Sequence, residues 1–164
     1  MPAASASAPP LEPYIHARVA GSRLLNESIK SNPLPPNDGQ QPIQVRIDAS
    51  STFSVSLSDL KEPNEMQIQV TFKAVVKAQD TGAELIEYAA QHLAQFRIFS
   101  KTGFDNWLQL PPGILEPYFS VANLSAVQRA ERALVEMGMH GVKIPQPLAF
   151  ELSPQAVLEQ TSGL

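Results

Sequence analysis

The sequence predicts an α+β protein, with a four-stranded antiparallel sheet covered on one face by two C-terminal helices. In residues 66–78 every even position is apolar and every odd position except Val75 is polar. This alternation is typical of a strand with one buried face. It returns in residues 85–98, where His92 is the only polar residue at an even position. Helical spacing begins only after Gly103, so the strands come first and the helices last.

The N-terminal part of the chain predicts a tail, a loop and the first strands. Residues 1–13 are mostly Ala, Ser and Pro, and we expect them to form a disordered tail. Residues 14–25 alternate weakly around Gly21, which predicts a strand with a bend or bulge at this glycine. Residues 31–42 hold four prolines and an Asn-Asp-Gly turn signal, so they should form an irregular loop. Residues 43–58 alternate again, as one long strand or two short ones.

The central hairpin is expected to turn at Asp-Thr-Gly in residues 80–82. A helix is predicted from the apolar spacing of three and four residues across 124–137. Ser125 could begin it through a capping box, which would leave Pro117 and Tyr118 in a separate turn. Ser153 and Pro154 are suited to start a last short helix that runs through Val157 and Leu158. We expect one domain over residues 14–158 and a short flexible tail over 159–164.

Composition narrows the classes of function. The chain has 164 residues, a net charge of −4 and no cysteine, which indicates one soluble domain with neither disulfides nor a cysteine-ligated metal. The negative charge disfavours nucleic acid as a partner. Neither a membrane-spanning run nor a signal peptide is evident, so we expect no membrane insertion and a cytoplasmic location. The enzyme motifs sought are absent, and we predict a non-enzyme without a cofactor. His92 is interpreted as a hydrogen-bonded core or interface histidine.

Apolar residues outside the regular pattern are the main functional signal. Phe104, Trp107 and Leu108 cluster in a predicted loop, and residues 144–152 alternate in a proline-held extended arm. These side chains could seal the edges of the sheet. They could also line a groove for an extended peptide.

Three passages resemble SecB, the bacterial export chaperone, and its SecB-like relatives. The first is the strand at residues 85–103. The second is Gly-Ile-Leu-Glu-Pro-Tyr at 113–118, which is similar to the family's Asn-Ile-Leu-x-Pro-Tyr before its long helix. The third is the Pro-rich arm at 144–152. The likeness covers about residues 14–158 and includes the order of the elements.

This resemblance implies an ATP-independent holdase that binds unfolded or pre-export polypeptides as a homotetramer, a dimer of dimers. The implied client groove comprises Phe104, Trp107, Leu108, Ile144, Leu148, Phe150 and Val157. The implied oligomer interface comprises Leu124, Val127, Leu134 and Met137. Candidates for docking the translocation motor SecA are Glu27 and Glu87.

Two alternatives remain open at this stage. SecB-like proteins outside general export include chaperones dedicated to an antitoxin, and Arg23 stands where the export family has an acidic residue. SecA is therefore the less expected partner. The other alternative is a structural or adaptor module whose apolar arm seals an oligomer interface.

Overall fold

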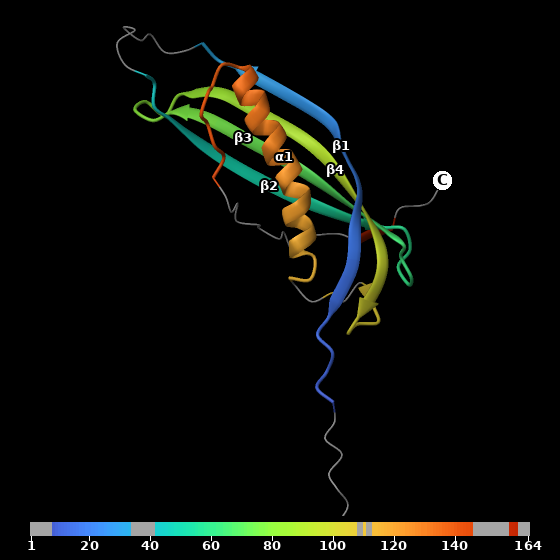
Figure 1. Cartoon of the computed structure of the whole chain (residues 1–164). Helices are drawn as coiled ribbons and strands as arrows, with labels where there is room; N and C mark the ends of the chain where they lie inside the picture. Colours follow the sequence, from blue (N-terminus) through green and yellow to red (C-terminus); the bar gives the residue numbers. More distant parts are fainter. Residues whose placement is uncertain (1–7, 34–41, 108–109, 111–112, 146–157, 161–164) are drawn as a thin grey trace, which may run out of the picture.

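The computed structural model describes residues 8–33, 42–107, 110, 113–145 and 158–160. Four long strands come first and one helix follows them (Figure 1). The elements are β1 (Tyr14–Ser31), β2 (Val45–Leu57), β3 (Glu65–Ala78), β4 (Glu84–Thr102), α1 (Glu116–Glu136) and β5 (Leu158–Gln160).

The sheet has the strand order β1-β4-β3-β2-β5. The four long strands are antiparallel to their neighbours, and the short β5 runs parallel to β2. Figure 1 shows α1 lying across one face of this curved sheet. The predicted class is therefore confirmed in its main part, a four-stranded antiparallel sheet with helical cover on one face.

The central hairpin follows the predicted alternation. Met66 of β3 lies opposite Phe96 of β4, and Val76 lies opposite Ile86. The even positions of both strands face α1 and supply 12 of the 26 buried apolar residues among those described. Gly82 in the turn has φ +70°, a conformation that side chains disfavour. Burial of one face fixed this register, because a slip of one residue would expose every apolar side chain.

The first strand is longer than expected and repeatedly bulged. Its pairing with β4 shifts between His16 and Ala17, between Val19 and Gly21, and between Leu24 and Asn26. The second shift confirms the irregularity predicted at Gly21. Residues 45–57 form a single strand, which resolves the choice between one long strand and two short ones.

The helix differs from the prediction at its start. It begins at Glu116 with Pro117 in its first turn and runs unbroken for 21 residues, so Ser125 lies inside it and is not a cap. Proline is accepted there because the first turn of a helix has no intrahelical partner for its N–H. The prediction of a separate turn at Pro117 and Tyr118 is therefore wrong.

Only one helix is present among the described residues. Most of the predicted second helix falls within 146–157, which lies outside the described residues. Leu158 was expected to end that helix, and it instead belongs to β5 beside Val55. The expectation of a helix at Leu158 is corrected accordingly.

Candidate functional site

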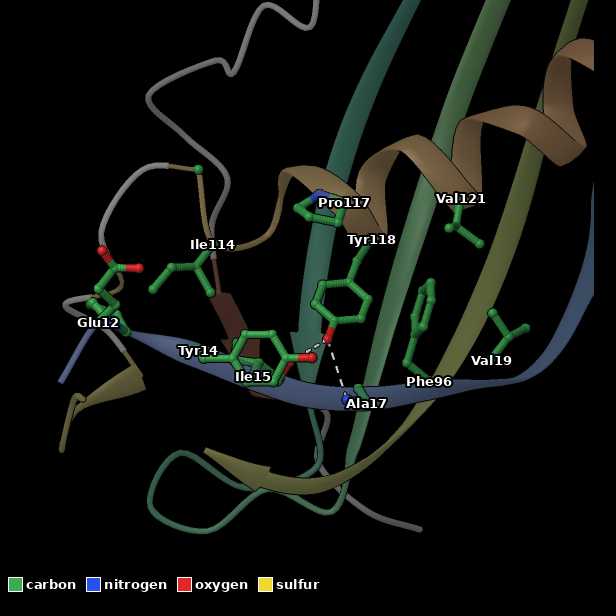
Figure 2. Close-up of a pocket in the computed structure, with 12 residues that line it drawn as sticks. Glu12, Tyr14, Ile15, Ala17, Val19, Phe96, Ile114, Pro117, Tyr118 and Val121 are labelled. Carbon is green, nitrogen blue, oxygen red and sulfur yellow. Dashed lines mark hydrogen bonds between the residues drawn. The ribbon is translucent and has the colours of Figure 1, made fainter. Parts of the chain in front are cut away.

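An open apolar pocket lies where the start of α1 meets β1 and the segment before it (Figure 2). Its volume is about 670 Å³, within the range of roughly 300–1,000 Å³ that is typical of ligand pockets. The walls come from three stretches of the chain, residues 12–19, Phe96 of β4 and residues 113–121. The lining residues are Glu12, Pro13, Tyr14, Ile15, Ala17, Val19, Phe96, Gly113, Ile114, Pro117, Tyr118 and Val121.

Tyr118 holds the floor of this pocket together. Its hydroxyl donates to the carbonyl of Ile15 at 2.6 Å and accepts from the N–H of Ala17 at 3.3 Å (Figure 2). The bulge between His16 and Ala17 disrupts the ladder there, which leaves these backbone groups available to a side chain. Burial raises the pKa of Tyr118, so the phenol stays protonated and keeps its donor. The ring packs edge-on against Phe96 at 5.2 Å.

The rim formed by Glu12 and Pro13 depends on a glycine at the end of β4. Gly103 has φ +78°, and a Cβ built on it would lie 2.8 Å from the carbonyl oxygen of Leu11 and 2.9 Å from backbone atoms of Glu12. Only glycine therefore allows the two chain segments to approach so closely.

Substituting Gly103 with alanine should lower the free energy of unfolding by about 2 kcal/mol, since it adds a backbone clash to the cost of a positive φ. Gly82→Ala is the matched control. Gly82 also has a positive φ but nothing within 4 Å of its Cβ position, so it should lose only about 1 kcal/mol. Urea unfolding of both variants measures the difference, and equal losses would show that the close approach at Gly103 is unimportant.

Apolar exposure continues from the pocket along β1. Val19, which is 54% exposed, and Leu24 and Ile29 pair with Phe96, His92 and Tyr88 of β4. Since those β4 residues face α1, the three side chains lie on the helix-bearing face of the sheet. They are nevertheless left uncovered there.

A second contact joins α1 to β1 beyond this apolar strip. The Oε2 of Glu27 accepts from Nη2 of Arg129 at 2.7 Å, and its Oε1 accepts from the hydroxyl of Tyr88 at 2.8 Å. These bonds, Arg129 first, outweigh burial and lower the pKa of Glu27. Burial and the carboxylate together raise the pKa of Tyr88. The helix is therefore tied to the edge strand at Tyr118 and at Arg129.

The buried His92 lies near this second contact between α1 and β1. His92 is buried as expected, and burial lowers its pKa more than the neighbouring Glu27 raises it. Its Nε2 has no hydrogen-bond partner within the part of the chain that the structure describes. The expectation of burial is met, whereas the expected hydrogen bond is not found at this nitrogen.

Comparison with solved structures supports the architecture. A SecB-like chaperone of Mycobacterium tuberculosis, in complex with a peptide from an antitoxin, superposes with a TM-score of 0.53. The alignment covers 79% of this chain and 88% of that chain at 13% identity. The chain has a SecB-like fold. No family model matches the sequence, and a search among curated proteins likewise finds no match.

Within this SecB-like fold, the candidates for the client groove do not form one open surface. Trp107 is only 1% exposed, packs edge-on against Phe104 at 5.1 Å and belongs to the main core. Ile144 is buried as well, and its N–H donates to Glu131 at 3.0 Å. The remaining candidates lie outside the described residues: Leu108, Leu148, Phe150 and Val157.

The two candidates for motor docking lie on opposite faces of the sheet. Glu27 points to the helix side and is bound by Arg129. Glu87 lies on the other face, where its carboxylate pairs with Lys73 at 3.6 Å. The structure therefore does not bring them together into one acidic surface.

The four candidates for the oligomer interface do not lie on one exposed surface. Val127 and Leu134 are buried against the sheet, whereas Leu124 is 51% exposed and Met137 is exposed too.

The apolar pocket between β1 and α1 was not predicted from the sequence. Its signal was present in the Ile-Leu-Glu-Pro-Tyr passage, which contributes Ile114, Pro117 and Tyr118 to the lining.

Two further features bear on other classes of site. The one helix among the described residues, α1, is not long and apolar enough to cross a membrane. Over the same ranges, the side chains that commonly bind metal ions do not gather in groups of three or more.

Proposed function

We propose that this protein is an ATP-independent chaperone that binds apolar segments of unfolded polypeptides in the pocket between β1 and α1. The observation that carries the proposal is the open 670 Å³ pocket lined by aliphatic and aromatic side chains. Burial of apolar surface is non-directional, so such a pocket can accept many sequences. The process requires no covalent step and no nucleotide.

The shape of the site suits an extended chain. Val19 lines the pocket, and Leu24 and Ile29 continue the exposed apolar row along β1. A client could therefore place one side chain in the pocket and further apolar side chains along the strand. Many weak contacts of this kind bind unfolded chains with little demand on sequence, and several sites in an oligomer add avidity.

A chaperone dedicated to one partner is the second candidate. The similar Mycobacterium tuberculosis protein is described in complex with an antitoxin peptide, which supports a polypeptide ligand of restricted sequence as an alternative to general clients. Co-purification of a single small protein with the native chain would favour this candidate. Co-purification of many different unfolded proteins with the native chain would favour the general holdase.

Assembly and delivery form the finer part of the proposal. We expect a homotetramer in the cytoplasm, with the exposed Leu124 and Met137 as the interface candidates that α1 still offers. Native mass spectrometry measures the assembly directly. Delivery of clients to SecA is less favoured, because Glu27 is already engaged by Arg129.

Substitution of Val19 by asparagine tests the pocket. Val19→Asn should weaken binding of a permanently unfolded probe, reduced carboxymethylated α-lactalbumin, by about tenfold, since an apolar contact is lost and a polar amide must be desolvated. Fluorescence anisotropy of the labelled probe measures this affinity. The substitution leaves α1 unchanged, so the proposed helical interface is not perturbed.

Leu25→Asn serves as the matched control on the same strand. Leu25 is similarly exposed and does not line the pocket, so its variant should bind within about twofold of wild type. Equal binding by wild type and Val19→Asn, or failure of wild type to slow the aggregation of an unfolding protein, would contradict the proposed function.

A further inference from the structure

The sheet face opposite α1 is positively charged, although the whole chain carries −4. We define this face by the residues of β4 from Glu84 to Arg97 that point away from α1. It also includes the residues of β1, β3 and β2 that lie opposite them in the register. It holds seven of the 12 basic residues and four of the 16 acidic residues, a net charge of +3. The basic residues are Arg18, Arg23, Lys30, Arg46, Lys73, Lys77 and Arg97, and the acidic residues are Asp48, Glu65, Glu84 and Glu87.

The half of this face over β2 and β3 is largely neutralised. Asp48 pairs with Arg46 at 3.3 Å and with Lys77 at 3.1 Å. Lys73 pairs with Glu87 at 3.6 Å. Opposite charges are therefore already matched there, and little attraction remains for a charged partner.

The part of β1 and β4 near Arg97, away from Glu84 and Glu87, is different. Arg18 lies directly opposite Arg97, and Arg23 lies opposite Leu93. Glu65 faces Arg97 from β3, but its carboxylate accepts from Gln67 at 2.8 Å. Ion pairs to these three guanidinium groups are absent among the described residues.

An exposed aromatic ring completes this surface. Phe99 is 55% exposed, and the guanidinium of Arg18 lies 5.5 Å from the centre of its ring. A guanidinium placed over an aromatic face can keep its edge N–H groups available to a ligand. We call Arg18, Arg23, Arg97 and Phe99 the arginine patch.

Like charges placed directly across a strand pair destabilise a sheet. Arg18 and Arg97 therefore repel each other in the isolated chain, and an anion bound between them would relieve the repulsion. Planar guanidinium groups match carboxylates through paired hydrogen bonds. On this chemistry we propose that the arginine patch docks an acidic, extended polypeptide segment of a partner protein.

The geometry of the patch favours such a segment. Side chains on one face of a strand recur about every 6.6–6.8 Å, which is also the spacing of alternate residues in an extended ligand. Arg23 lies opposite Leu93, four residues along β4 from Arg97, so the two levels of the patch are about 13 Å apart, or two such spacings. Carboxylates four residues apart in the ligand could thus reach both levels, with apolar side chains against Phe99. A long nucleic acid fits less well, since the remainder of the chain is acidic and repels phosphates.

The arginine patch and the apolar pocket lie on opposite faces of β1 and β4. Val19 of the pocket pairs with Phe96, whose side chain faces α1, whereas Arg18 of the patch pairs with Arg97 on the other face. A partner on the patch would therefore leave the pocket free for another ligand. The inference does not depend on the proposed chaperone function.

A charge-matched pair of triple variants tests the proposal. The probe is a fluorescein-labelled peptide of alternating Glu and Ser residues, about 12 residues long, which spans about 40 Å when extended. Substituting Arg18, Arg23 and Arg97 with glutamine should weaken its binding about tenfold. Raising the ionic strength should weaken wild-type binding as well.

The control removes three cations from other surfaces, at Lys61, Arg132 and Lys143, and also replaces them with glutamine. It has the same net charge and should bind the peptide within about twofold of wild type. Urea unfolding should show the patch variant to be no less stable than wild type, since it removes a repulsion.

Three results would overturn the proposal. The first is equal weakening in both variants, which would indicate an effect of net charge alone. The second is wild-type preference for a DNA duplex over the acidic peptide. The third is absence of peptide binding at about 1 mM and low salt.

Discussion

Replacing Trp107 with alanine is expected to lower the free energy of unfolding by about 3–5 kcal/mol, which is the usual loss when a buried aromatic side chain is truncated. Trp107 is 1% exposed and packs in the same core as residues of β3, β4 and α1. Its ring meets Phe104 edge-on with centroids 5.1 Å apart. Urea unfolding followed by circular dichroism measures the loss.

Client binding distinguishes this expectation from the role that the sequence suggested. Under conditions where Trp107→Ala remains folded, it should bind the unfolded probe about as well as wild type. Trp107→Phe should recover much of the stability, since it restores most of the buried ring. A variant of unchanged stability with weak probe binding would instead assign Trp107 to the client groove.

The sheet was the most predictable part of the molecule. Alternation over residues 66–78 and 85–98 predicts both the strands and their buried faces, because a period of two has one structural solution when one face must be covered. The bulges of β1 were harder to predict. Only the one at Gly21 had a signal in the sequence, and the other two follow from pairing with β4.

The helix shows where periodicity alone is insufficient. Leu124, Val127, Leu134 and Met137 share the spacing of a single apolar stripe, yet Val127 and Leu134 meet the sheet while Leu124 and Met137 are exposed. The buried face of the helix instead contains four alanines, Ala122, Ala126, Ala130 and Ala133; Leu124 lies outside this face, and Met137 follows the last residue of the helix. Asn123 is buried on that face too, where it accepts from Ser51 at 2.6 Å, a contact that no sequence pattern indicated.

The candidate site was less predictable than the fold. A tryptophan in a loop reads equally well as a binding residue or a core residue, because the sequence does not say which segment covers it. The pocket needs Tyr118 to reach two backbone groups of β1, 101 and 103 residues away along the chain. Such a contact depends on the path of α1 over the edge strand, and the spacing of residues in the sequence does not predict it.

Removing the carboxylate of Glu27 should cost about 2–3 kcal/mol of unfolding free energy. The side chain is 18% exposed and joins β1 to Arg129 of α1 and Tyr88 of β4. Glu27→Ala leaves the guanidinium without its carboxylate partner on β1 and the buried hydroxyl without an acceptor. Chemical unfolding at neutral pH measures the loss, with Glu87→Ala as the control.

Glu87 is a suitable control because it is also a glutamate with an ion pair, on the opposite and more exposed face of the sheet. Its removal should cost less than about 1 kcal/mol, as is usual for surface pairs. Equal losses in the two variants would contradict the proposed tie between α1 and the edge strand.

The stabilisation by Glu27 should also depend on pH in a defined direction. The bond from Arg129, followed by that from Tyr88, lowers the pKa of Glu27 below its ordinary value of 4.5, so the unfolded chain takes up the proton more readily than the folded chain. The contribution is therefore complete above the unfolded pKa and is lost as the pH falls through the lowered folded pKa. The stability gap between wild type and Glu27→Ala should be constant near neutral pH and shrink below about pH 4.5. A gap that persists unchanged into acid would show that packing, and not the charged carboxylate, accounts for the loss.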